Sequence, residues 1–278
     1  MLYRPNKPAV YLKIMKWVGK MTWTAISKSE HSEMLVRRPD NLSFLSKDIL
    51  VSICSFELAA CATYLPIIFG KENNRIMPFA MMGIERNKNL IINSEGKWII
   101  DFFPANIATY PFKIAEKENG EKIIVFFNDG KLVSLDGEGE RLFNEDGTES
   151  KIFSHYVQLL ARVEKSNEIL QEACSLLEDL GVFEPFAVEV PSGGEDKARL
   201  DGLIRINPAK FQDLDDKDFV NLRQKNALDL AYAHFYSLGS IRRLNLFRNA
   251  GGQTTEELAG VSSKVFGSDK QSLNVENC

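Results

Sequence analysis

The sequence predicts an α+β protein in which antiparallel β-hairpins pack against two long helices, forming one compact domain. Three observations predict this class. Short apolar runs separated by turn residues fill 76–135, an amphipathic helical pattern covers about 151–180, and a second helical pattern follows another strand pair after residue 206. Because the β runs come before the long helices rather than alternating with them, antiparallel sheets are favoured over a doubly wound parallel sheet.

The composition is typical of a soluble globular protein. Hydrophobic residues make up 44% and charged residues 26% of the 278 residues. Only three histidines and four cysteines are present, and the cysteines lack paired spacing. This scarcity predicts reduced thiols and argues against a zinc site, another metal centre or a disulfide scaffold. We therefore expect no metal and no cofactor. The net charge of −4 argues against a nucleic-acid partner.

The two ends differ from the body of the chain. The first 29 residues carry six basic side chains and no acid, which is typical of a solvated leader, although an anionic partner or membrane surface would also suit it. Lysines at 13, 16 and 20 interrupt any apolar core of an export signal, so we expect a cytoplasmic protein. The expected organisation is a loose leader over 1–20, a domain over 21–248 and a disordered polar tail over 249–278.

The first structured region is predicted over 49–70, where Glu57 is the only charged residue. The segment is long enough to span a bilayer. Glu57 and the helix-breaking Pro66 argue against such a span. We expect instead a strand, a buried helix from an N-cap at Ser55 to about Tyr64, and a short strand over Pro66–Phe69.

Two hairpins are predicted next. Asn89–Ile92 and Lys97–Phe102 flank one turn, and Lys122–Phe127 and Lys131–Leu135 flank an Asn-Asp-Gly turn. The intervening segment, Pro104–Phe112, has a proline near each end and is expected to be a shaped loop rather than a helix.

The remaining elements follow from periodicity and capping residues. A helix over 151–180 has an apolar stripe interrupted by Asn167, with Gly181 as its C′ residue. A strand pair, Pro185–Val190 and Arg199–Ile206, comes next. Further helix starts are expected at Asn207 and at Asp215, the second beginning a long helix that ends at Gly239. The expected stripe consists of Tyr156, Leu160, Val163, Leu170, Cys174 and Leu177.

The acidic stretch Asp136–Glu140 is the most motif-like part of the chain, but its spacing fits no known loop. A dinucleotide-binding loop would need a third glycine, and a calcium loop would need glycine at 141 and glutamate at 147. Those positions hold Arg141 and Gly147. We therefore expect a solvated loop here, with a weak cation site as the alternative.

Five residues are candidates for binding. Trp98, Tyr110 and Phe112 either line a pocket together with Phe102 or pack in the core. Asp201 and His234 are polar candidates from the C-terminal half, and His234 alternatively is a core histidine with satisfied ring nitrogens. If Asp201, His234, Tyr110 and Arg37 converged, the protein would be an enzyme with a site assembled from distant residues.

The chain from about 23 to 244 also resembles the SapC family. The order and spacing of several short stretches carry the resemblance: Phe56-Glu57, Tyr64–Phe69, Asn89-Leu90, Gly96–Trp98, Pro104-Ala105, Tyr110–Phe112, Leu142-Phe143, Asp146-Gly147, Leu200–Gly202, Ala233-His234 and Ser237-Leu238. It implies a soluble bacterial protein without an established reaction, most simply an accessory or binding protein linked to surface-layer or cell-envelope biogenesis and export, with a protein partner. The alternative is an enzyme acting on a small molecule or peptide. A peptide-transporter permease shares the family's name, but this chain lacks the multiple spans of a permease.

Overall fold

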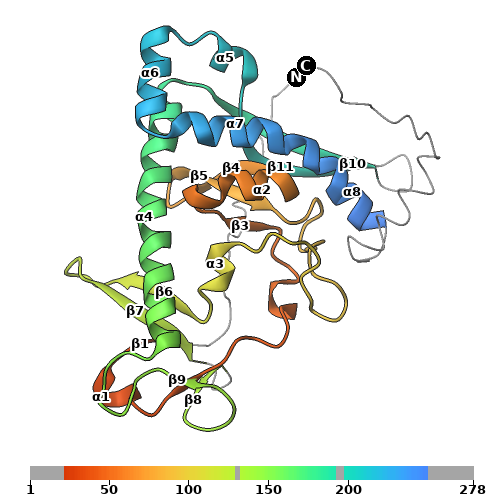
Figure 1. Ribbon diagram of the computed structural model, residues 1–278. Coiled ribbons are helices and arrows are strands. Elements are labelled where there is room, and N and C mark those ends of the chain that lie inside the picture. Colours follow the sequence, from red (N-terminus) through yellow and green to blue (C-terminus); the bar gives the residue numbers. More distant parts are fainter. Residues whose placement is uncertain (1–21, 129–131, 192–196, 250–278) are drawn as a thin grey trace, which may run out of the picture.

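The computed structural model describes residues 22–128, 132–191 and 197–249 (Figure 1). The expected leader and tail lie outside this part, apart from Asn249. The fold is α+β, as predicted. Its main sheet contains five antiparallel strands in the order β10 (Phe183–Pro191), β11 (Lys197–Ile206), β4 (Ile67–Glu72), β5 (Arg75–Met81) and β3 (Leu50–Ser52). The predicted strands at about 50, 67, 185 and 199 are therefore confirmed, and the single pair Ile204–Phe69 joins β11 to β4.

A second sheet corrects one predicted hairpin. Its order is β1 (Thr22–Ala25), β7 (Lys122–Asn128) and β6 (Phe112–Glu116), so β7 pairs with the strand before it and not with residues 131–135. The turn at Asn119-Gly120 makes the β6–β7 hairpin, and β1 occupies the other edge of β7. A third sheet contains β8 (Val133–Ser134), β2 (Leu35–Val36) and β9 (Glu140–Arg141).

The other predicted hairpin is only partly present. The chain does turn at Asn93–Gly96, but the two arms meet in one isolated bridge between Ile92 and Trp98. The segment predicted to be a loop over 104–112 contains a single helical turn, α3 (Ala105–Ala108), followed by a cis peptide bond between Tyr110 and Pro111. Pro104 tolerates this position because the missing N–H of a proline is not needed at a helix start.

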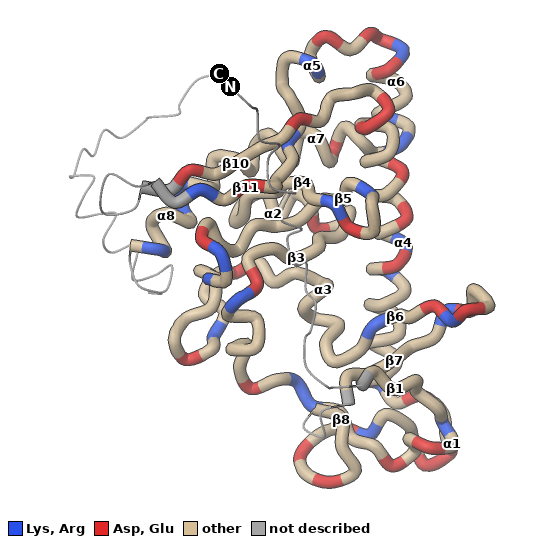
Figure 2. The backbone as a smooth tube through the Cα atoms, turned by 180° about the vertical axis from the view of Figure 1, so that it is seen from behind, with Lys and Arg blue, Asp and Glu red and all other residues tan. Residues whose placement is uncertain are grey.

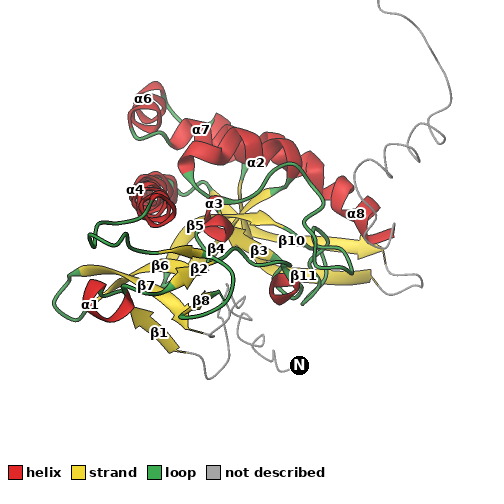
Figure 3. Cartoon of the chain, turned by 60° about the horizontal axis from the view of Figure 1, so that its bottom comes forward, coloured by secondary structure: helices red, strands yellow, loops and turns green. Residues whose placement is uncertain are grey.

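Helix α4 (Lys151–Asp179) connects the two larger sheets. All six residues of its predicted stripe are buried, Ser150 caps its start and Gly181 follows its end with φ 65°. The helix is about 43 Å long at 1.5 Å per residue. Its N-terminal half packs on β6 and β7 and its C-terminal half on the main sheet. Figure 3 looks almost along α4 and shows both sheets on the same side of the helix.

The second long helix is broken. Asn207 and Asp215 cap helices as predicted, but Asn226 adopts a left-handed φ of 57° and separates two helices where one was expected. An additional helix follows the predicted end at Gly239. The four helices are α5 (Pro208–Gln212), α6 (Asp216–Gln224), α7 (Ala227–Ser237) and α8 (Ile241–Asn249). Helix α1 (Lys28–His31) is a single turn.

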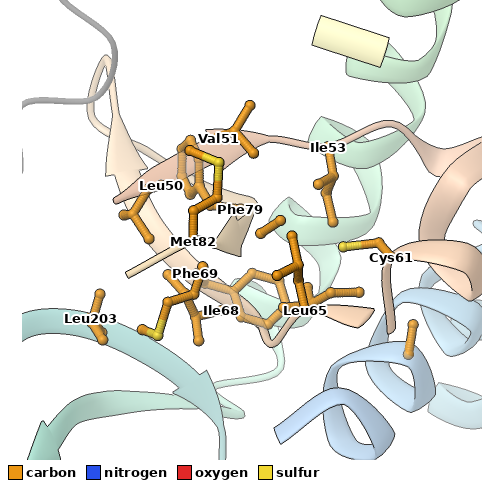
Figure 4. Packing of buried hydrophobic residues seen from close by; sticks show 14 of the residues in the cluster. Leu50, Val51, Ile53, Cys61, Leu65, Ile68, Phe69, Phe79, Met82 and Leu203 are labelled. Atoms are coloured by element: carbon orange, nitrogen blue, oxygen red, sulfur yellow. The ribbon is translucent and has the colours of Figure 1, made fainter. Parts of the chain in front are cut away.

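The largest core lies between the main sheet and the helices that cover it, α2 (Leu58–Tyr64), α7 and the end of α4. Figure 4 shows Phe69, Phe79, Ile68 and Leu65 packed together, and all four are fully buried. The predicted helix after Ser55 is present, but only Leu58 and Cys61 of α2 are buried. Its first turn is a 3₁₀ turn over Ser55–Glu57, and the N-cap position is Cys54 rather than Ser55. No helix in the described part of the chain is both long and apolar enough to cross a membrane.

Candidate functional site

The segment from Pro104 to Phe112 lies between two cavities. Ile107 and Tyr110 line both of them. We call the first the aromatic cavity; it has a volume of about 580 Å³ and also involves residues 38–42, 96–98 and the first half of α4. We call the second the inter-sheet cavity; it has a volume of about 470 Å³ and lies between β5, β6 and α4. Two of the predicted binding residues, Tyr110 and Phe112, come from this segment.

The aromatic cavity is lined by five rings, those of Trp98, Phe103, Tyr110, His155 and Tyr156. The Trp98 indole N–H donates a 2.7 Å hydrogen bond to the Phe102 carbonyl, which fixes the ring. Phe103 meets Trp98 edge to face, with 5.1 Å between ring centroids, and is 41% exposed. An aromatic ring that is held in place yet open to solvent is a ready contact for a partner's apolar side chain.

The charged residues around this cavity are mostly paired. Asp40 forms a 2.6 Å ion pair with Arg37, and Lys97 forms a 2.9 Å pair with Glu95. Burial raises the pKa of the Tyr156 hydroxyl, and the charge and hydrogen bond of Arg38 partly offset that rise. The cavity therefore combines an aromatic lining with a cationic rim at Arg38.

Buried hydrogen bonds hold the Pro104–Phe112 segment against the main sheet. The Glu57 carboxylate accepts from the backbone N–H groups of Cys54 at 2.9 Å and Ala105 at 3.0 Å. Asn106 donates its side-chain amide to the Ser52 carbonyl at 2.9 Å. Burial raises the pKa of Glu57, and the two backbone hydrogen bonds lower it in part. Glu57 thus positions the start of α3 and, through it, the residues that line both cavities.

The other predicted binding residues lie elsewhere. Phe112 is 2% exposed and packs under α4, although it also reaches the wall of the inter-sheet cavity. His234 is fully buried between α7 and the main sheet. Its Nδ1 lies 2.7 Å from the Ile67 carbonyl, and its Nε2 accepts from the Ile206 N–H at 3.2 Å. It is therefore a core histidine with both ring nitrogens satisfied.

Asp201 is exposed on β11 and forms a 2.6 Å ion pair with Arg199. It lies five residues along the strand from Ile206, the partner of His234, which corresponds to about 17 Å in an extended chain. The residues of the hypothetical enzyme site, Asp201, His234, Tyr110 and Arg37, do not converge. The structure brings together only Trp98 and Tyr110 of the five candidates in the aromatic cavity.

The cysteines within the described ranges are buried thiols. Burial raises the pKa of Cys54 to about 12 and also raises the pKa values of Cys61 and Cys174. A thiol that stays protonated is a poor nucleophile. No group of three or more potential metal ligands occurs among the described residues. The acidic stretch at 136–140 is exposed throughout.

Sequence reasoning missed several residues that line the cavities. Phe103 is one of them, and the signal that could have found it is its place beside Phe102, because adjacent side chains of an extended segment point in opposite directions. Asn167, the interruption in the apolar stripe of α4, lines the inter-sheet cavity together with Glu72 and Lys113. Asn167 was a visible signal, whereas nothing in the sequence brings Glu72 and Lys113 together.

Comparisons with known proteins give one match. The family model described as SapC matches residues 26–244, which is most of the chain. Neither the curated proteins nor the solved structures contain a match.

Proposed function

Because the chain belongs to the SapC family, we propose that it is an accessory protein of surface-layer or cell-envelope biogenesis and export that acts by binding a protein partner. The aromatic cavity is the proposed contact. The single observation that carries this choice is the ring pair Trp98–Phe103, in which a hydrogen-bonded indole supports a phenylalanine that is 41% exposed.

The chemistry of the cavity indicates what the partner presents. Partly exposed aromatic rings favour an apolar or aromatic side chain, because burying such a side chain there removes apolar surface from water on both molecules. The nearby guanidinium of Arg38 favours an acidic group beside it. The partner is therefore a protein surface with an apolar anchor next to a carboxylate.

The setting that we propose is the cytoplasm. Three free, buried cysteines suit a reducing compartment. The net charge of −4, and the distribution of both signs of charge along the chain in Figure 2, do not favour a nucleic-acid partner.

We expect Phe103→Ala to release the partner while leaving the fold intact, because the ring is a surface anchor rather than a core residue. The loss of such an anchor weakens binding by about 2 kcal/mol or more. The measurement is recovery of the partner with the tagged full chain from native cells, followed by native mass spectrometry that also detects retained small molecules.

Tyr236→Ala is the matched control, since Tyr236 is 77% exposed on α7 and lies outside both cavities. If the wild-type chain retained neither a defined protein nor a ligand, the binding role would be wrong. If Tyr236→Ala released the partner and Phe103→Ala did not, the contact would lie on the α2–α7 face instead.

A further inference from the structure

The inter-sheet cavity is bounded by the free edges of two sheets. Strand β6 is the edge of its sheet. Strand β5 pairs with β3 only through Phe79–Met81, so Arg75–Pro78 has no strand partner on that side among the described residues. Both free stretches line the cavity. An unpaired strand edge is a template for another strand.

The backbone direction at the edge of β6 follows from two hydrogen bonds. The Phe127 N–H donates to the Pro111 carbonyl across the hairpin, and the Phe112 N–H donates away from β7 to Thr109. Backbone groups alternate in direction along a strand. The N–H and carbonyl of Ile114 therefore point out of the β6 edge toward the cavity side.

The backbone groups of β5 also alternate in direction along the strand. The Met82 N–H donates to Ile49 on the β3 side, whereas the Met81 N–H donates to Pro66 on the β4 side. Alternation then places the N–H and carbonyl of Ile76 on the β3 side, beyond the last residue of β3. Pro78, which has no N–H, stands at the same edge, where prolines are tolerated.

Two side-chain hydrogen bonds connect the elements around the cavity to α4. Arg75, at the start of β5, donates to the Gln171 side chain at 2.6 Å, and Lys122 of the β6–β7 hairpin donates to Glu164 at 2.6 Å. Gln171 and Glu164 are seven residues apart, about 10 Å along α4.

Three polar side chains line this cavity without a side-chain hydrogen bond or an ion pair among the described residues. Asn167 lies on α4 between Glu164 and Gln171, is partly exposed, and its side-chain amide makes no hydrogen bond with the described chain. The Glu72 carboxylate forms no ion pair there, and burial raises its pKa. The Lys113 ammonium lies 3.8 Å from the centre of the Trp23 ring without a carboxylate partner, and burial lowers its pKa.

We propose that the inter-sheet cavity binds an extended peptide segment of a partner protein, which adds as a strand between β5 and β6. The segment carries a basic side chain that pairs with Glu72 and an acidic side chain that pairs with Lys113. The Asn167 amide, which can both donate and accept, meets the peptide backbone midway. Strand addition obtains its affinity from backbone hydrogen bonds and its specificity from side chains. This site shares only the wall residues Ile107 and Tyr110 with the aromatic cavity and does not depend on a partner binding there.

The test uses the full chain and a displayed library of random heptapeptides. We expect the selected peptides to carry one basic and one acidic residue at a fixed offset. Synthetic copies should bind Asn167→Leu and Glu72→Gln at least about tenfold more weakly than wild type, about 1.4 kcal/mol each. Gln158→Leu is the matched control on the exposed side of α4 and should bind within about twofold of wild type.

Backbone methylation separates strand insertion from side-chain binding. Methylating either alternate set of peptide amides should abolish binding, because one set faces β5 and the other β6. A peptide that tolerates methylation of one whole set would contradict insertion between two edges. Failure of the library to yield any enriched peptide, or equal binding to wild type and Asn167→Leu, would overturn the proposal. Because Phe103 is untouched in these variants, the outcome is independent of partner capture by the aromatic cavity.

Discussion

Lowering the pH from 7 toward 4 is expected to destabilise the fold by about 3 kcal/mol through His234 alone. Burial lowers the pKa of His234 from 6.5 to about 4; the nearby Arg205 charge adds to this, and the hydrogen bond to Ile67 opposes it. Between pH 6.5 and 4, His234 therefore binds a proton in the unfolded chain but stays neutral in the folded chain. The stability contribution is complete above about pH 6.5 and is lost as the pH falls toward 4.

His234→Asn removes the titration while keeping a hydrogen-bond donor near the Ile67 carbonyl. We expect it to cost about 2 kcal/mol at pH 7, because the Ile206 N–H loses its acceptor. Its free energy of unfolding should then change less between pH 6.5 and 4 than that of wild type. Urea unfolding at a series of pH values measures both effects. His155→Asn, on the exposed side of α4, is the control and should keep the wild-type slope. An unchanged slope in His234→Asn would contradict the assignment.

Glu57→Ala is expected to destabilise the protein by about 2–4 kcal/mol, because two buried backbone N–H groups, those of Cys54 and Ala105, lose their acceptor together. The same change releases the start of α3, so the Ala105 amide should exchange its hydrogen much faster than in wild type. Glu57→Gln keeps the size of the side chain but has only one oxygen, and its effect should fall between those of wild type and Glu57→Ala.

The matched control is Glu172→Ala, which removes an exposed ion pair with Lys225. Exposed pairs contribute little, so this variant should stay within about 0.5 kcal/mol of wild type. Urea unfolding and amide exchange on all three variants check the prediction. If Glu57→Ala lost no more stability than Glu172→Ala, the carboxylate would not be what holds the Pro104–Phe112 segment.

Local signals in the sequence were reliable where the deciding interaction is itself local. The stripe of α4, its C′ glycine, the caps at Asn207 and Asp215 and the β10–β11 hairpin were all predicted correctly. Each depends on residues a few positions apart, because helical periodicity, capping and tight turns involve near neighbours in the chain.

The wrong predictions concern strand pairing and helix length, which depend on segments distant in the sequence. Strand β7 had two possible neighbours in sequence, and the pairing went to β6, with β1 covering the other edge. The long C-terminal helix contains no proline, yet it breaks at Asn226, where a left-handed residue lets α6 and α7 take different directions. Asparagine tolerates that conformation better than most residues, so the position permitted the break without predicting it.

The sequence by itself determined the α+β class, the SapC resemblance, the long amphipathic helix and the scarcity of histidine and cysteine. Only the tertiary structure decided that the strands near 67–81 and 183–206 form one sheet, that His234 is buried in the core, and that residues of β5, β6 and α4 line one cavity. Those outcomes depend on which segments, distant from one another in the sequence, pack together and exclude water. Packing of that kind is a property of the whole chain and leaves no short-range pattern in the sequence.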